Sequence, residues 1–255
     1  MLLAIDIGNT NIVLGGIENG KIRFEARMAT DRIKTADQYC AELKNILALF
    51  EVVPGDIEGS IISSVVPLVQ QIMVRAVERL TGLPCLTVGP GLKTGLNIKI
   101  DNPAQAGSDL IVGSVAAIAA YGTPLCVIDL GTATTISVID RDGVFRGGSI
   151  APGVMLSLNA LSGGTAQLPG ISLEQPKRAI GTNTVDSMRS GLLLGSAAML
   201  DGMVERIEQE LGYPTRVVAT GGLAKFIVPL CQREMEIDDK LLLRGLDLIY
   251  RKNKR

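Results

Sequence analysis

Two copies of one short pattern constrain the fold of this chain more than any other feature. Each copy is an apolar run that ends in an aspartate and a glycine turn, at residues 2–11 and again at 125–135. Glycine lets the backbone turn tightly and approach a ligand closely. The Asn and Thr residues that follow offer donors to phosphate oxygens, and the aspartate can hold a cation. One copy is typical of an ordinary turn, but two in matching context predict a duplicated domain that binds a nucleotide.

The composition and charge exclude several classes of protein. With 47% apolar residues, the 255-residue chain can bury a proper core. Its 25 basic and 26 acidic residues give a net charge of −1, and only 3% of residues are aromatic, so we expect no nucleic-acid partner. No apolar run approaches the ~18 residues of a membrane span, and no basic region precedes an N-terminal apolar stretch. We therefore expect no membrane association and a cytoplasmic protein.

The reactive side chains are restricted as well. The chain has no histidine, so proton transfer must fall to a carboxylate, Lys, Tyr or Cys. The four cysteines lie far apart without a C-x-x-C pair, which favours buried, reduced thiols over a zinc site or a disulfide framework; they are Cys40, Cys85, Cys126 and Cys231.

Hydrophobic periodicity predicts the order strand, hairpin, helix, strand, helix twice. The first set comprises a β-meander over 2–28, a helix over 35–50, a strand over 59–66 and a helix over 67–80. The second comprises a strand over 125–130, a meander over 136–150, a long helix over 184–212, a strand over 216–220 and a helix over 223–232. A helix over 109–121 precedes this second set, residues 161–181 are predicted to be a loop, and 240–253 to be a closing helix. The boundary near 117–123 predicts domains 1–117 and 118–255.

Further motifs occur in an order and spacing that are specific together. They are Asp6–Thr10, Ile61–Pro67, Val88–Leu96, Asp101–Pro103, Gly107–Asp109, Asp129–Thr135, Gly147–Gly153, Ile180–Thr184 and Thr220–Ala224. Over essentially its whole length the chain resembles the type III pantothenate kinases of the actin-like sugar kinase and Hsp70 superfamily. The resemblance implies an α/β fold of duplicated actin-like (ribonuclease H-like) ATPase domains with an ATP cleft between them.

The resemblance also implies an activity: transfer of the ATP γ-phosphoryl group to the hydroxyl of pantothenate, the first step of coenzyme A synthesis. Asp129 would bind a monovalent cation, K⁺ or NH₄⁺, and Mg²⁺ would accompany ATP. The residues implied in ATP binding are Asp6, Ile7, Gly8, Asn9, Thr10, Asn11, Ile12, Val13, Thr132, Gly221 and Gly222. The simpler alternatives are a hairpin turn after Asp6, a turn cap at Asp129 and a plain strand-to-helix turn at Gly221.

Asp109 is the candidate general base. It lies at the predicted start of a helix, where the helix dipole favours the charged carboxylate; a plain first-turn Asp is the alternative. The resemblance places the acceptor on residues Gly107, Ser108, Asp109, Leu110 and Thr184. It also implies a homodimer. Thr184 could instead be a helix N-cap.

Two positions depart from the family pattern. Ile100 and Leu110 stand where the family usually carries Tyr and Arg. Both are implied on the pantothenate side, where an Arg would neutralise the substrate carboxylate. This leaves two alternatives: a family relative that acts on a different pantothenate-like acceptor, or a regulatory or accessory protein.

Overall fold

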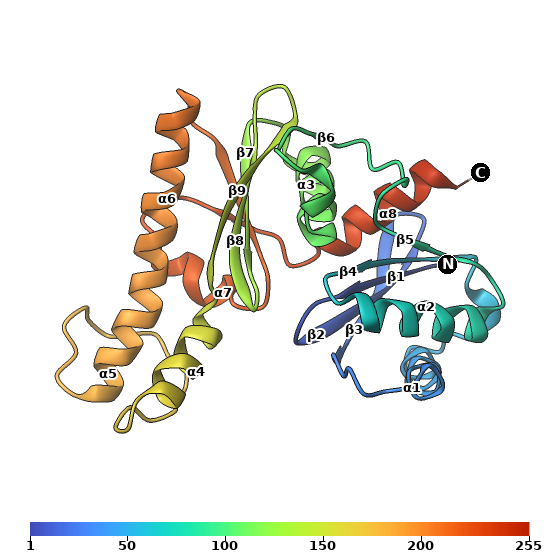
Figure 1. Cartoon of the computed structure of the whole chain (residues 1–255), viewed down its shortest axis with the longest axis horizontal. Helices are drawn as coiled ribbons and strands as arrows, with labels where there is room; N and C mark the ends of the chain where they lie inside the picture. Colours follow the sequence, from blue (N-terminus) through green and yellow to red (C-terminus); the bar gives the residue numbers. More distant parts are fainter. Residues whose placement is uncertain (255) are drawn as a thin grey trace. The chain divides into compact units, whose positions relative to one another are not determined.

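The structure, a computed structural model that describes residues 1–254, divides into two compact units (Figure 1). Unit 1 comprises Met1–Leu96, Asp101–Ala116 and the described residues from Lys240 on, and unit 2 comprises Asn97–Ile100 and Ala117–Asp239. The predicted second domain, 118–255, is therefore wrong at its C-terminal end. The last helix, α8 (Leu241–Asn253), belongs to unit 1, because its apolar face packs on strands of that unit.

Unit 1 is a five-stranded sheet with helices on both faces. Its strands are β1 (Leu2–Ile7), β2 (Asn11–Glu18), β3 (Lys21–Ala29), β4 (Gly59–Ser64) and β5 (Cys85–Thr87), and its helices besides α8 are α1 (Ala36–Leu49), α2 (Pro67–Thr81) and the first part of α3 (Ser108–Tyr121). Short 3₁₀ turns lie at Pro54–Asp56 and Pro103–Gln105. The strand order is β3-β2-β1-β4-β5, antiparallel through β3, β2 and β1 and parallel from β1 to β5.

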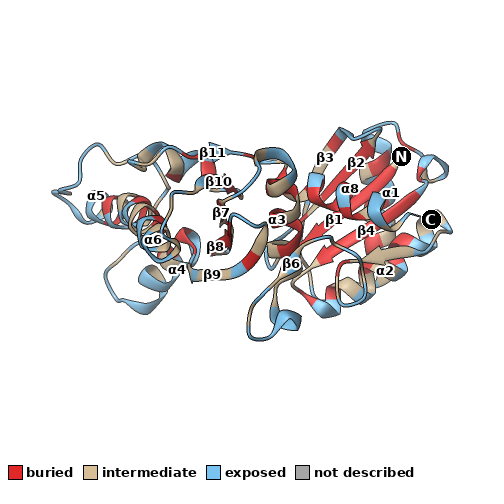
Figure 2. Cartoon of the chain, turned by 90° about the horizontal axis from the view of Figure 1, so that it is seen from above, coloured by how far each residue is buried: buried red, intermediate tan, exposed pale blue. Residues whose placement is uncertain are grey.

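Both faces of the central strand β1 are buried, which explains its continuous apolar sequence. Leu3, Ile5 and Ile7 join the core under α1 and α2, whereas Leu2 and Ala4 join a second core with α8. The alternation follows from the two-residue period of a strand. Figure 2 shows the buried residues concentrated in the strands of this unit.

Unit 2 holds a six-stranded sheet. Its strands are β6 (Asn97–Ile98), β7 (Leu125–Leu130), β8 (Ala133–Ile139), β9 (Val144–Pro152), β10 (Arg216–Thr220) and β11 (Glu236–Ile237). Its helices besides the end of α3 are α4 (Val154–Gly164), α5 (Thr184–Arg189), α6 (Gly195–Leu211) and α7 (Ala224–Ile227), with a π turn at Ser190–Leu194 and a 3₁₀ turn at Val228–Leu230. The sheet and the helices α4, α6 and α7 share one apolar core.

The two sheets repeat one topology. Unit 2 has the order β9-β8-β7-β10-β11, with β6 added beside β9, and this matches β3-β2-β1-β4-β5 of unit 1 strand for strand. β7 pairs antiparallel with β8 and parallel with β10, as β1 does with β2 and β4. The duplication predicted from the two Asp-x-Gly patterns is confirmed.

Three predicted elements differ from the structure. Residues 154–164 form α4, which includes part of the predicted loop; the two glycines at its end, Gly163 and Gly164, obscured it. The long helix over 184–212 is interrupted by the π turn at Ser190–Leu194. The helix over 223–232 ends early, because Pro229 cannot continue the backbone hydrogen bonds of α7.

Within residues 1–254, none of the helices has the length and apolar character needed to cross a membrane.

Candidate functional site

Asp6 lies near the end of the central strand of unit 1 and is only 8% exposed. In register it lies beside Val13 on β2 and Ser63 on β4. The turn after it is closed by the amide of Gly8, which donates to the carbonyl of Asn11 at 3.0 Å. The turn at this sheet edge is therefore held closed by a backbone hydrogen bond, and its residues, Gly8 to Asn11, all belong to the predicted phosphate loop.

The segment after β3 supports this turn from the side. The hydroxyl of Thr30 donates to the carbonyl of Gly8 at 2.7 Å, and the amide of Thr30 donates to the carbonyl of Thr10 at 2.9 Å. Arg32, which is exposed, donates to the side-chain oxygen of Asn9 at 3.4 Å. Arg32 lies outside every sequence motif, so its contact with Asn9 could not be expected from the sequence. Its position gives the loop a cation suited to phosphate.

The second Asp-x-Gly strand end repeats this arrangement in unit 2. Asp129 on β7 lies in register beside Thr135 on β8 and Thr220 on β10. The amide of Gly131 donates to the carbonyl of Ala133 at 3.1 Å and closes the turn. A hydroxyl residue on the neighbouring parallel strand thus accompanies the aspartate in each unit: Ser63 beside Asp6 and Thr220 beside Asp129.

Two glycines are required by close backbone approach at this strand end. A Cβ on Gly221, whose φ is +94°, would lie 2.5 Å from the carboxylate Oδ1 of Asp129 and 2.7 Å from the backbone of Leu130. A Cβ on Gly153 would lie 2.3 Å from the carbonyl oxygen of Thr132. A side chain at Gly221 would therefore fill the space beside the Asp129 carboxylate. The structure thus brings Gly221 against Asp129, with Gly222 next in the chain, and places Thr132 in the turn that follows β7.

At this strand end the Asp129 carboxylate, which lies close to Gly131 and Gly221, offers oxygen ligands. Among the described residues 1–254, no group of three or more His, Cys, Asp or Glu side chains could hold a metal ion. Carboxylate oxygens are ligands that suit a hard cation.

The carboxylate of Asp109 lies in the first turn of α3 and is half-buried. Its Oδ1 accepts a hydrogen bond from the amide of Leu110 at 2.8 Å. Burial raises the pKa of the Asp109 carboxyl, and the backbone amides of Leu110 and Asp109 oppose this rise only in part. The amides at the helix start lower the pKa, in the direction expected from the helix dipole, but the effect of burial is larger. A raised pKa makes the ionised form a stronger base.

The hydroxyl of Ser108, a predicted acceptor-binding residue, is turned toward β4. It donates to the carbonyl of Ser64 at 2.9 Å and accepts from the amide of Ser64 at 3.0 Å. The side chain of Ser108 therefore holds the start of α3 against β4. Gly107 and Leu110, two further predicted acceptor residues, lie beside Ser108 and Asp109 in the same segment of unit 1.

Thr184, the remaining predicted acceptor residue, is the first residue of α5 and is exposed. The N-cap is Asn183, whose Oδ1 accepts from the amide of Asp186 at 2.9 Å, so the alternative of Thr184 as N-cap is wrong. Thr184 lines a cavity of about 710 Å³. The other lining residues are Leu161, Leu168, Gly181, Thr182, Asn183, Ser187, Met188, Gly191 and Leu192.

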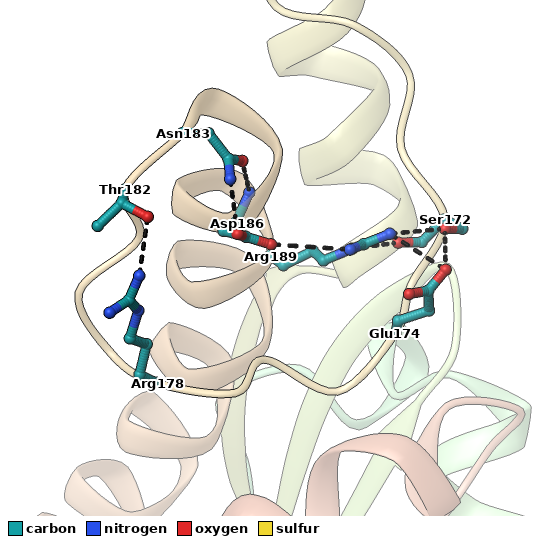
Figure 3. Close-up of polar contacts among 7 residues, drawn as sticks. All are labelled: Ser172, Glu174, Arg178, Thr182, Asn183, Asp186 and Arg189. Carbon is teal, nitrogen blue, oxygen red and sulfur yellow. Dashed lines mark hydrogen bonds and ion pairs between the residues drawn. The ribbon is translucent and has the colours of Figure 1, made fainter.

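Arg189 fastens the segment before α5 to that helix, as Figure 3 shows. Its guanidinium donates to the carbonyl of Ser172 at 3.1 Å and to the hydroxyl of Ser172 at 2.9 Å, and it pairs with Glu174 at 3.1 Å. Arg178 donates to the hydroxyl of Thr182 at 2.8 Å at the edge of the cavity. These contacts fix the shape of the cavity edge that carries Thr184.

The two departures from the family pattern belong to different units. Ile100 lies in unit 2, where a Cβ on Gly147 would contact its Cγ2 at 3.5 Å, and Leu110 lies in unit 1. Unit 1 thus holds Asp6–Val13 and Gly107–Leu110, whereas unit 2 holds Asp129, Thr132, Thr184, Gly221 and Gly222.

Curated proteins are similar to this chain over its full length. A type III pantothenate kinase from Listeria monocytogenes serotype 4a (strain HCC23) is 44% identical over 254 residues, covering 100% of this chain and 98% of the relative. Two solved structures are similar in fold. A putative Baf family transcriptional activator from Campylobacter jejuni has a TM-score of 0.64 and 18% identity and covers 98% of each chain. The ADPNP-bound activator of 2-hydroxyisocaproyl-CoA dehydratase from Clostridium difficile has a TM-score of 0.58 and 13% identity and covers 98% of this chain and 93% of that chain.

These similar folds confirm the predicted actin-like α/β architecture, as the repeated sheets do. The family model described as type III pantothenate kinase matches residues 2–206. This chain therefore belongs to the type III pantothenate kinase family.

Proposed function

We propose that this protein transfers the γ-phosphoryl group of ATP to the hydroxyl of pantothenate and forms 4′-phosphopantothenate, the first step of coenzyme A biosynthesis. The proposal rests on one observation: the chain matches the type III pantothenate kinase family over its full length and has an aspartate near the end of the corresponding strand, β1 or β7, in each repeated sheet. Such a reaction needs mainly positioning of the two substrates and neutralisation of charge.

The loop from Asp6 to Val13 contacts the phosphates of ATP in this proposal, and Gly221 and Gly222 lie on the adenosine side. The turn closed between Gly8 and Asn11 supports a phosphate-contacting role, since backbone hydrogen bonds hold it and it carries exposed polar side chains. Arg32 adds a positive charge beside Asn9.

Asp129 would hold a K⁺ or NH₄⁺ ion, with Thr132 beside it. A monovalent cation there would offset repulsion between the carboxylate and the ATP phosphates. Mg²⁺ is proposed as the ion that accompanies ATP.

Asp109 acts as the general base. The pantothenate hydroxyl oxygen forms a bond to the γ-phosphorus, its proton passes to the Asp109 carboxylate, and the bond between the γ-phosphorus and the bridging oxygen breaks to release ADP. The raised pKa of Asp109 supports this role, because a more basic carboxylate accepts the proton more readily.

The test is a product assay with purified protein, ATP, Mg²⁺ and K⁺. We expect pantothenate to yield a product heavier by one phosphoryl group, with one ADP formed for each product. Pantetheine, which lacks the carboxylate, serves as the comparison acceptor. Preference for pantetheine would replace pantothenate as the acceptor, and ATP binding without transfer to either compound would favour an accessory protein.

We further propose that the protein is a cytoplasmic homodimer. Several large apolar side chains of unit 2 are exposed, among them Ile150, Met155, Leu156, Leu161 and Ile180. In the π turn and α6 that follow α5, Cβ atoms on Gly191, Gly195 and Gly202 would meet nothing within 4 Å. A helix with open glycine positions lets a second helix approach closely, and the apolar residues supply surface to bury.

Sedimentation at micromolar concentration tests the dimer, with Gly195→Glu as the disrupting variant. Since the space beside Gly195 is open within one protomer, the variant should fold normally and sediment as a monomer. Gly89→Glu, at another open glycine outside this surface, is the matched control and should remain dimeric. A wild type with the mass of one chain would contradict the proposal.

A further inference from the structure

Ser108 and Ser63 connect the start of α3 to β4. The hydroxyl of Ser63, which is fully buried, donates to the hydroxyl of Ser108 at 3.1 Å. The Ser108 hydroxyl in turn donates to the carbonyl of Ser64 and accepts from the amide of Ser64. A hydroxyl has one donor and two acceptor sites. All three are occupied by β4, so the Ser108 side chain has no capacity left for a ligand.

The same two serines relate the base to the phosphate loop within unit 1. Ser63 lies in register beside Asp6, the residue that begins the loop. Asp109 follows Ser108 directly at the start of α3. A continuous path therefore runs from Asp6 through Ser63 and Ser108 to Asp109, made of one strand pairing, one hydroxyl contact and one peptide bond.

We propose that Ser108 and Ser63 are positioning residues for phosphoryl transfer, which fix the Asp109 carboxylate relative to the phosphate loop that begins at Asp6. This inference rests on the proposed role of Asp109 as base. Neither serine touches the reacting atoms. Ser108 acts by holding the first turn of α3 against the backbone of Ser64, and Ser63 acts by holding Ser108 beside the strand that carries Asp6.

The hydroxyl pair matters because general-base catalysis depends on position. A base displaced by about 1 Å can lower a rate by roughly 10²-fold. Without the Ser108 hydroxyl, the amide and carbonyl of Ser64 lose their partner, and the start of α3 is free to move away from β4. Water would then reach the half-buried Asp109 carboxylate and remove part of the burial that raises its pKa.

The experiment compares Ser108→Ala, Ser63→Ala and Ser108→Thr, which keeps the hydroxyl, in the product assay. We expect Ser108→Ala to lower kcat by about 10- to 100-fold with the KM for ATP changed by less than about 2-fold. The acidic limb of its kcat–pH profile should move to lower pH, as the Asp109 pKa falls toward its ordinary value. Ser63→Ala should show the same effects more weakly, and Ser108→Thr should restore most of the rate.

Ser114→Ala is the matched control. It also removes a buried hydroxyl from α3, one that donates to the carbonyl of Leu110 at 2.7 Å within the helix. It should leave kcat and the pH profile unchanged.

Three outcomes would overturn the inference. Equal losses in Ser108→Ala and Ser114→Ala would mean that any weakening of α3 has the effect. A wild-type profile for Ser108→Ala, while Asp109→Asn is inactive, would refute the positioning role alone. Full activity of Asp109→Asn would refute the base assignment and the inference with it.

Discussion

Replacing Gly221 by alanine tests whether the close approach at the second Asp-x-Gly turn is needed for stability and for nucleotide binding. The added Cβ would lie 2.5 Å from Oδ1 of Asp129 and 2.7 Å from both N and C of Leu130. The Leu130 backbone belongs to β7, which is paired on both sides, so it cannot move away without disturbing the ladder. The Asp129 carboxylate is the more mobile neighbour and should be displaced.

The expected loss of stability has two parts. A non-glycine residue at φ +94° costs about 1–2 kcal/mol. Overpacking against a fixed backbone adds about 1–3 kcal/mol. The free energy of unfolding should therefore fall by about 2–5 kcal/mol, which lowers Tm by about 4–20 °C at roughly 2–4 °C per kcal/mol.

Gly212→Ala separates these two parts. Gly212 also has a positive φ, +78°, but a Cβ there would meet nothing within 4 Å. This variant should lose only the conformational part, about 1–2 kcal/mol. Denaturant unfolding gives the stability of both variants, and calorimetric titration gives their ATP affinity. Gly221→Ala should bind ATP more weakly, and Gly212→Ala should bind it normally. Equal stabilities and a wild-type ATP affinity for Gly221→Ala would refute the reasoning.

Three further predictions concern the proposed kinase reaction. Asp129→Asn should lose the dependence on K⁺ together with most of the rate; equal wild-type activity in Na⁺ and K⁺ would contradict the cation assignment. Asp109→Asn should lower kcat by about 10²- to 10⁴-fold and leave ATP binding nearly intact. Burial raises the pKa of Asp109 in the folded state, so ionisation of this carboxyl lowers the stability of the wild type as the pH rises through that pKa. Asp109→Asn should therefore also have a higher Tm than wild type at pH ~7 but not at pH ~3. Ile100→Tyr with Leu110→Arg should lower the KM for pantothenate, since one charge-assisted contact contributes about 1.5–3 kcal/mol, or roughly 10- to 150-fold in kcat/KM; a low wild-type KM with no gain from Leu110→Arg would mean that another cation binds the carboxylate.

The sequence predicted most of the fold because its strongest signals are local. Apolar runs that end in Asp-x-Gly mark the central strand of each sheet, and the two predicted meanders are present as β1–β3 and β7–β9. The membership of α8 in unit 1 could not be predicted in this way. Its amphipathic pattern shows that one face is buried but does not identify the strands on which that face packs.

The candidate site residues that lie in sequence motifs could be predicted, whereas those identified by contacts between distant segments could not. The Asp6 turn, Asp129 and the start of α3 could be found from sequence. The contact of Arg32 with Asn9, and the use of the Ser108 hydroxyl by Ser64, depend on segments that are distant in sequence. Burial of Asp109 is also a property of the packed fold, so the dipole argument alone missed the direction of its pKa.

The placement of α8 in unit 1 has a consequence for synthesis on the ribosome. The sheet of unit 1 is complete once β5 has emerged, yet Leu243, Leu246 and Ile249 pack on one of its faces and are made only after unit 2. At ~5–20 residues per second, synthesis from Ala116 to the end of α8 at Asn253 takes roughly 7–27 s. During that interval Leu2, Ala4 and Ile61 lack the α8 residues with which they share a core. Unit 2 is largely a single stretch of chain and can fold first. The N-terminal part of unit 1 is therefore expected to reach its native state last. Its exposed apolar face is the surface that a ribosome-associated chaperone would need to cover.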